Sequence, residues 1–147
     1  MKKLLISDKI SDFFNKNRKY WQIKGKVVYG NGIGSKIGFP TANIKPENID
    51  LLPNEGVYAV FLEINGELFK AMLNIGIRPT FDLHDKVVEA NIFNFNDNIY
   101  HKNISVYFVE KIRDEIKFDS KEKLISQLLK DKKHIINILK KSEKPQL

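Results

Sequence analysis

The sequence predicts a mainly β domain, in which antiparallel strands form a closed or nearly closed barrel with a helix packed on it. Strand-like runs fill the middle of the 147-residue chain, and two of them are joined by an Asn-Gly pair. The last part of the chain then changes to apolar residues at helical spacing, which predicts one long helix after the strands. A chain of this length forms one domain with its own core.

The first predicted elements are a short helix and a strand. Ser7–Asn17 carries Ile10, Phe13 and Phe14 at helical spacing. Gln22–Tyr29 alternates as a strand does, and it leads into a loop that holds four of the eight glycines: Gly30, Gly32, Gly34 and Gly38.

A hairpin is the clearest feature of the middle region. Asn65-Gly66 separates two strand-like runs, and this pair favours a type I′ turn because both positions need a positive φ. Two further strands are expected after the hairpin, joined by a polar stretch. The four predicted strands are Gly56–Ile64, Glu67–Ile75, Val87–Phe95 and Asn103–Ile112.

The C-terminal region predicts an amphipathic helix. Asp119-Ser120-Lys121-Glu122 has the form of a capping box, with an acceptor at Asp119 and a glutamate three residues later. Lys and Asp residues form the expected polar face. The expected apolar face comprises Leu124, Leu128, Ile135 and Leu139, with Ile125, Leu129 and Ile136 beside it.

Composition narrows the possible functions. The chain has no cysteine, which excludes a disulfide framework, a thiolate metal site and a cysteine nucleophile. Its apolar runs are too short to span a bilayer, and we expect a cytoplasmic protein. The net charge is +7, but residues 37–110 carry five basic and ten acidic residues, so the basic charge lies near the two ends. Basic residues near the ends of the chain suit either a phosphate-binding site or solvent-exposed helices. The net charge by itself also leaves nucleic-acid binding possible.

The glycine-rich loop is a candidate phosphate site. Glycines let backbone N–H groups surround a phosphate, and Lys36 adds a positive charge. Thr41 and Asn43 follow as hard oxygen ligands that share one side if the segment is extended, which suits Mg²⁺ bound to ATP. The spacing does not match a Walker A loop. A flexible turn with a side-chain cap explains the same composition equally well.

Glu89 is a candidate general base. It lies in a strand-like run whose apolar residues face the other way, and a carboxylate on a rigid strand is well placed to accept a proton. Taken alone, an outward-facing strand glutamate is the commoner explanation. Arg113 and Asp114 lie in a charged segment before the last helix, which taken alone is an ordinary connector.

Several segments together resemble the riboflavin kinase domain, which in most bacteria forms the C-terminal half of a bifunctional riboflavin kinase/FAD synthetase. The resemblance runs from about Trp21 to the final helix. It implies a six-stranded antiparallel Greek-key β-barrel with a C-terminal helix and a short N-terminal helix. Residues 1–20 would then be a linker remnant and residues 21–147 the kinase domain. The matching segments are Gly25–Gly30, Gly38–Asn43, Gly56–Tyr58, Asn74–Gly76, Arg78–Phe81, Val88-Glu89, Tyr100, Arg113 and Phe118.

The resemblance also implies the role of each candidate residue. Glu89 would accept the proton of the ribityl 5′-hydroxyl as ATP phosphorylates riboflavin to give FMN and ADP. Thr41 and Asn43 would hold Mg²⁺ and the γ-phosphate. The residues expected to bind ATP are Gly30, Gly34, Lys36, Gly38, Thr41 and Asn43, and those expected on the flavin side are Arg113 and Asp114.

Two other functions fit the sequence less well. A small basic barrel that binds single-stranded nucleic acid needs a positive sheet face, whereas the predicted strands are acidic. A flavin-binding protein without catalysis would not need Thr41, Asn43 and Glu89. We therefore expect a monomer with riboflavin/FMN and ATP/ADP as partners, and neither nucleic acid nor a membrane. The chain has three histidines and no paired-histidine nucleotidyltransferase motif, so FAD synthesis is not expected.

Overall fold

A computed structural model describes residues 10–28, 41–79, 84–95 and 98–147. The predicted glycine loop around residues 30–38 lies outside these ranges. The elements, in chain order, are α1 (Ile10–Asn17), β1 (Trp21–Val28), β2 (Ala42–Pro46), a 3₁₀ turn (Ile49–Leu51), β3 (Gly56–Ile64), β4 (Glu67–Pro79), β5 (His84–Ile92), β6 (Asn103–Arg113) and α3 (Lys121–Lys141).

The six strands form a closed antiparallel barrel. Their order around the barrel is β1-β2-β5-β4-β3-β6, and β6 pairs with β1 to close it. β3, β4 and β5 follow one another as neighbours, while β6 returns to lie beside β3. This is a Greek-key connection, so the predicted fold class is confirmed.

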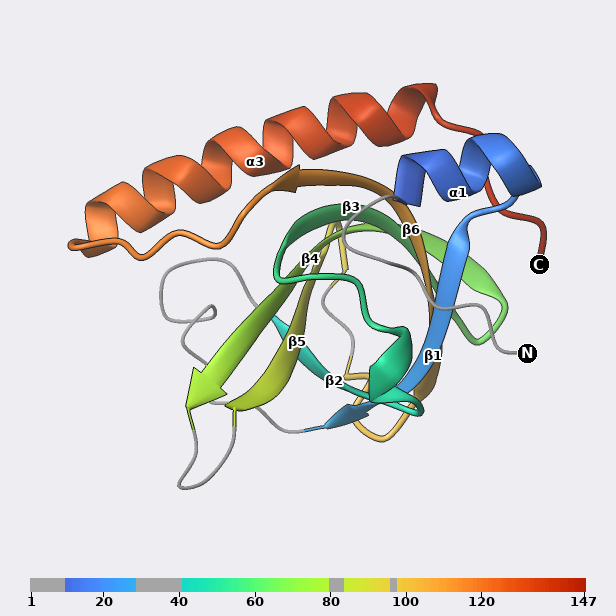
Figure 1. Cartoon of the computed structure of the whole chain (residues 1–147), viewed down its shortest axis with the longest axis horizontal. Helices are drawn as coiled ribbons and strands as arrows, with labels where there is room; N and C mark the ends of the chain where they lie inside the picture. The colour runs from blue at the N-terminus through green and yellow to red at the C-terminus, as the bar shows by residue number, and fades with distance from the viewer. Residues whose placement is uncertain (1–9, 29–40, 80–83, 96–97) are drawn as a thin grey trace.

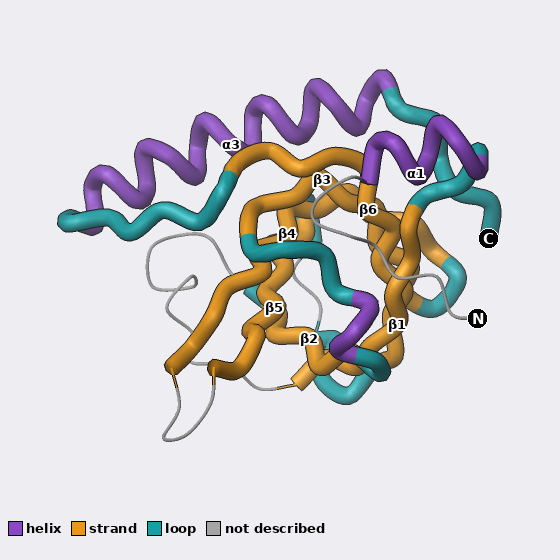
Figure 2. The backbone as a smooth tube through the Cα atoms, in the orientation of Figure 1, coloured by secondary structure: helices purple, strands orange, loops and turns teal. Residues whose placement is uncertain are grey.

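The barrel has one core inside it and a second core on its outer face. The inner core takes alternate residues from all six strands, among them Ile23, Ile44, Leu73, Val88 and Phe108. The second core lies between the barrel and the helices, where α3 crosses the strands (Figures 1 and 2). β3 lies under α3, so its residues from Val57 to Leu62 are buried on both faces and read as one continuous apolar run.

The hairpin turn was predicted correctly. Asn65 has a φ of 52° and Gly66 a φ of 83°, as a type I′ turn requires.

The boundaries of β4 and β5 differ from the predicted ones. β4 continues to Pro79, and β5 begins at His84 and ends at Ile92, before a turn in which Asn94 has a φ of 55°.

β2 was not recognised as a strand from the sequence. It has only five residues, and Ile44 is its one buried side chain, so it carries too little alternation to be detected alone. Its extended conformation is stabilised by pairing with β1 on one side and β5 on the other.

The start of α3 differs from the predicted capping box by one residue. Ser120, not Asp119, is the N-cap, and its hydroxyl accepts a hydrogen bond from the backbone N–H of Lys123 at 3.1 Å. The residue three positions after the cap is therefore a lysine, which cannot complete the box. Asp119 instead pairs with the Lys123 side chain.

The buried face of α3 also differs from the prediction in three residues. Ile135 and Leu139 are buried as expected, whereas Leu129 is 56% exposed and Ile136 is 39% exposed. Asp131, which was assigned to the polar face, is only 2% exposed. Its burial has a local cause, because it pairs with an arginine of β6.

Candidate active site

Three polar side chains lie in one row across the outer face of the barrel. Asn43 of β2 pairs with Glu89 of β5, and Glu89 pairs with Asn74 of β4. Their chain neighbours Ile44 and Val88 belong to the inner core, so by strand alternation the row points outward. Directly paired residues have Cβ atoms roughly 4.5–5.5 Å apart, which places the three polar groups side by side.

Thr41 joins this row from just before β2. Its hydroxyl donates a hydrogen bond to Glu89 Oε2 at 3.4 Å. Both residues are half-buried. Two segments that are far apart in the sequence therefore meet at one place, where Thr41 and Asn43 lie beside Glu89.

Glu115 reaches the row from the connector between β6 and α3. Its Oε2 atom lies 3.0 Å from the position that a Cβ on Gly76 would occupy, so a side chain at residue 76 would crowd it. Partial burial is the main reason that the pKa of Glu115 is raised, and the nearby Glu89 raises it further. A hydrogen bond from Asn74 and the charge of Arg113 act in the opposite direction on this pKa.

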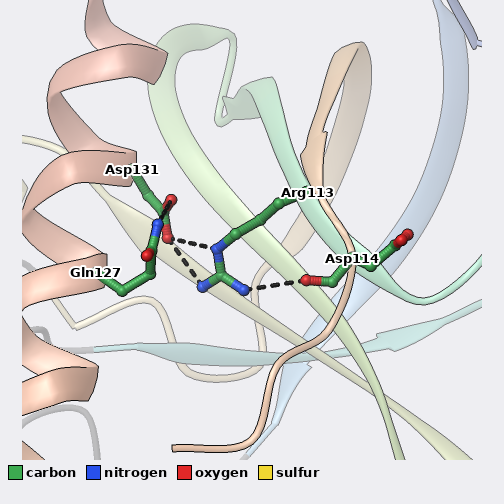
Figure 3. Close-up of polar contacts among 4 residues, drawn as sticks. All are labelled: Arg113, Asp114, Gln127 and Asp131. Atoms are coloured by element: carbon green, nitrogen blue, oxygen red, sulfur yellow. Dashed lines mark hydrogen bonds and ion pairs between the residues drawn. The ribbon is translucent and has the colours of Figure 1, made fainter.

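The guanidinium of Arg113 points to Asp131 of α3 (Figure 3). Its Nε and Nη2 atoms both lie 2.9 Å from Asp131 Oδ2. Nη1 donates to the backbone carbonyl of Asp114 at 3.1 Å, and the guanidinium lies 5.8 Å from the centre of the Phe118 ring. Gln127 donates to the other oxygen of Asp131 at 2.9 Å.

The structure thus brings together part of the predicted site. Thr41, Asn43 and Glu89 are adjacent. The guanidinium of Arg113, in contrast, forms an ion pair with Asp131. The Asp114 side chain is exposed and pairs with Lys111. Gly30, Gly34, Lys36 and Gly38 lie outside the described residues. Asn74 and Glu115 were not among the predicted site residues. Asn74 could have been found from the strand register, but nothing in the sequence indicates where Glu115 lies.

The oxygen ligands present fit a magnesium ion bound to a nucleotide. Thr41 and Asn43 supply uncharged hard oxygens beside the Glu89 carboxylate. Within the described ranges, no group of three or more His, Asp or Glu side chains could hold an ion by itself. Mg²⁺ bound to ATP suits such a site, because phosphate and water fill most of its coordination sphere.

Two other features of the described surface lie away from this row. One hollow of about 460 Å³ is lined by Phe69 and its neighbours, and another of about 300 Å³ by Tyr20 and its neighbours. None of the five residues at the row lines either hollow. Among the helices described, none is both long and apolar enough to cross a membrane.

Comparison with known proteins gives a consistent result. The family model described as flavokinase (riboflavin kinase) matches residues 17–139. A bifunctional riboflavin kinase/FMN adenylyltransferase from Bacillus subtilis is 41% identical over 78% of this chain and 37% of its own length. An RNA-binding riboflavin kinase from the same organism is 39% identical over 74% of this chain and 47% of its own length. The chain therefore spans less than half the length of these relatives.

A solved structure supports the fold assignment. The crystal structure of a macrolide-efflux protein from Streptococcus pneumoniae superimposes with a TM-score of 0.85 at 36% identity, over 89% of this chain and 43% of that one. The fold is a closed Greek-key barrel with a row of oxygen-bearing side chains on its outer face. The family match covers most of the chain, and the protein belongs to the riboflavin kinase family.

Proposed function

We propose that the protein transfers the γ-phosphate of ATP to the ribityl 5′-hydroxyl of riboflavin, giving FMN and ADP. The observation that carries this proposal is the hydrogen bond between Thr41 and Glu89, because it joins the expected phosphate side of the site to the expected base. The family match supports the choice of riboflavin as the acceptor.

The chemistry needs one proton acceptor and a way of fixing two substrates in line. Glu89 Oε1 or Oε2 would accept the hydroxyl proton as the hydroxyl oxygen bonds to the γ-phosphorus, and the bond from that phosphorus to the bridging oxygen of ADP breaks. Thr41 donates to Glu89 and so holds one carboxylate oxygen in place. The rigid pairing of β2, β5 and β4 fixes these groups before substrate binds.

Thr41 and Asn43 would hold the magnesium ion. When bound, the ion supplies positive charge that offsets the negative charge of the phosphate oxygens. The flavin-side roles of Arg113 and Asp114, the monomeric state, the lack of a nucleic-acid partner and the cytoplasmic location stay predictions.

Incubation with riboflavin, ATP and Mg²⁺, followed by chromatographic separation of the flavins, tests the proposed function. We expect FMN to accumulate with time and enzyme concentration, and no FAD to form. A folded protein that makes no more FMN than a control without enzyme would refute the proposal.

Replacement of Thr41 by alanine tests the metal site. Thr41→Ala should weaken Mg²⁺-dependent ATP binding by at least about tenfold, because one of two protein oxygens is lost, while the half-buried position leaves the fold intact. ATP affinity measured across a Mg²⁺ titration gives the effect. Thr41→Ser, which keeps the hydroxyl, is the matched control and should remain close to the unchanged protein. An unaltered Mg²⁺ dependence in the alanine variant would exclude Thr41 as a ligand.

A further inference from the structure

The carbonyl oxygen of the Asn74 side chain is buried and has no hydrogen-bond partner among the described residues. Oδ1 of Asn74 is the buried side-chain atom that no other described residue satisfies. The amide N–H of the same side chain is engaged, because it donates to Glu115. Buried polar groups are nearly always paired in native proteins, so this oxygen needs a donor from elsewhere.

Two carboxylates adjoin Asn74 among the described residues. Its neighbour on β5 is Glu89, and Glu115 lies above it on the connector. Both are carboxylates, which accept hydrogen bonds when ionised, and the neighbour on β3 is Val57, which cannot donate through its side chain. A ligand that fits here must therefore bring hydrogen-bond donors.

Glu115 fixes the direction in which the Asn74 amide points. By accepting from the amide N–H, it turns the carbonyl oxygen away from the connector. This contact depends on Gly76, two residues along β4 on the same face. A Cβ at residue 76 would lie 3.0 Å from Glu115 Oε2 and would displace the carboxylate.

We propose that Asn74 Oδ1 accepts a hydrogen bond from a hydroxyl group of the substrate's polyol chain, and that Glu115 is the positioning residue that orients Asn74. The inference rests on the proposed function. Glu89 is expected to take the terminal hydroxyl, and Asn74 lies beside it at the paired position. The separation of roughly 5 Å between paired Cβ atoms lets one polyol chain reach both side chains. Asn74 therefore selects flavins that carry the chain.

Binding of two flavins to the full chain distinguishes this role from a general structural one. Riboflavin and lumiflavin share the ring system, but lumiflavin has a methyl group in place of the polyol. Their dissociation constants would be measured by fluorescence with Mg²⁺-ADP and again with ADP and EDTA. Asn74→Leu should weaken riboflavin binding by about tenfold and leave lumiflavin binding unchanged, in both conditions. Asn103→Leu, the same change at an exposed site on β6, is the control.

Variants at the connector test the positioning role without altering Asn74. Glu115→Ala should weaken riboflavin binding several-fold, and Glu115→Gln should restore it because the glutamine oxygen still accepts from Asn74. Gly76→Ala should resemble Glu115→Ala. These variants also keep the proposal testable if Asn74→Leu fails to fold.

Four results would overturn the inference: equal losses for the two flavins, no loss for either, a loss seen only with Mg²⁺, or a Glu115→Gln variant as weak as Glu115→Ala. Failure of the proposed function is a separate outcome, because in that case the protein without any substitution would make no FMN.

Discussion

Glu89→Gln is expected to lower kcat by about 10²–10⁴-fold while riboflavin and ATP affinities change much less. Glutamine keeps the size of the side chain and can still accept from the Thr41 hydroxyl, but it cannot take up the proton of the attacking alcohol. An alcohol is a poor nucleophile at neutral pH, so the loss falls on the chemical step. Steady-state kinetics with separate binding measurements would show this division.

Glu63→Gln is the matched control for this experiment. Glu63 lies on β3, also in a strand of the barrel, but it pairs with Leu68 and Ser105, and neither of these belongs to the polar row. It should leave turnover nearly unchanged. If Glu89→Gln also turned over at the rate of the unchanged protein, Glu89 would have no part in proton transfer and would be an ordinary outward-facing strand residue.

Asp131→Ala is expected to lower the free energy of unfolding by about 3–5 kcal/mol. The Asp131 side chain is 3% exposed and that of Arg113 is 15% exposed, so removal of the carboxylate leaves a poorly solvated guanidinium without its counter-charge. Gln127 would lose its acceptor at the same time. Denaturant titration monitored by the single tryptophan, Trp21, measures the change.

Two further variants show whether burial of the ion pair causes this loss. Asp119→Ala removes another carboxylate of the same region, but its pair with Lys123 is exposed, and the cost should be about 0–1 kcal/mol. The double replacement Arg113→Met with Asp131→Leu should cost less than Asp131→Ala alone, because no unpaired charge remains. A double variant less stable than the single one would contradict the explanation.

Sequence periodicity was sufficient to predict the elements that bury one complete face. β1 alternates between buried and exposed residues along most of its length, and the Asn65-Gly66 turn determines the register of the hairpin. Periodicity failed where tertiary contacts decide the structure. β2 is a strand because β1 and β5 pair with it, and Asp131 is buried because Arg113 neutralises it.

The site shows the same limit. Thr41, Asn43 and Glu89 are recognisable by chemical type and by position within ordered motifs, and the strand register places them together. The other two residues of the site could not be predicted, because contacts between different segments of the chain bring them there. Asn74 becomes a neighbour of Glu89 only through the pairing of β4 with β5, and Glu115 becomes one only because the connector passes over Gly76.

Closure of the barrel by β1 and β6 has a consequence for the order in which the chain folds as it is synthesised. Trp21 pairs with Phe108, so the first strand of the barrel to be synthesised waits for the last strand of the barrel before its second edge is covered. Until β6 is available, β1 and β3 each have one edge whose backbone N–H and C=O groups are unpaired beside apolar side chains. Such exposed edges are prone to aggregation. The hairpin of β3 and β4 needs no such wait, because its pairing is local. We therefore expect it to form early on the nascent chain, and β6 to pair with β1 and β3 last.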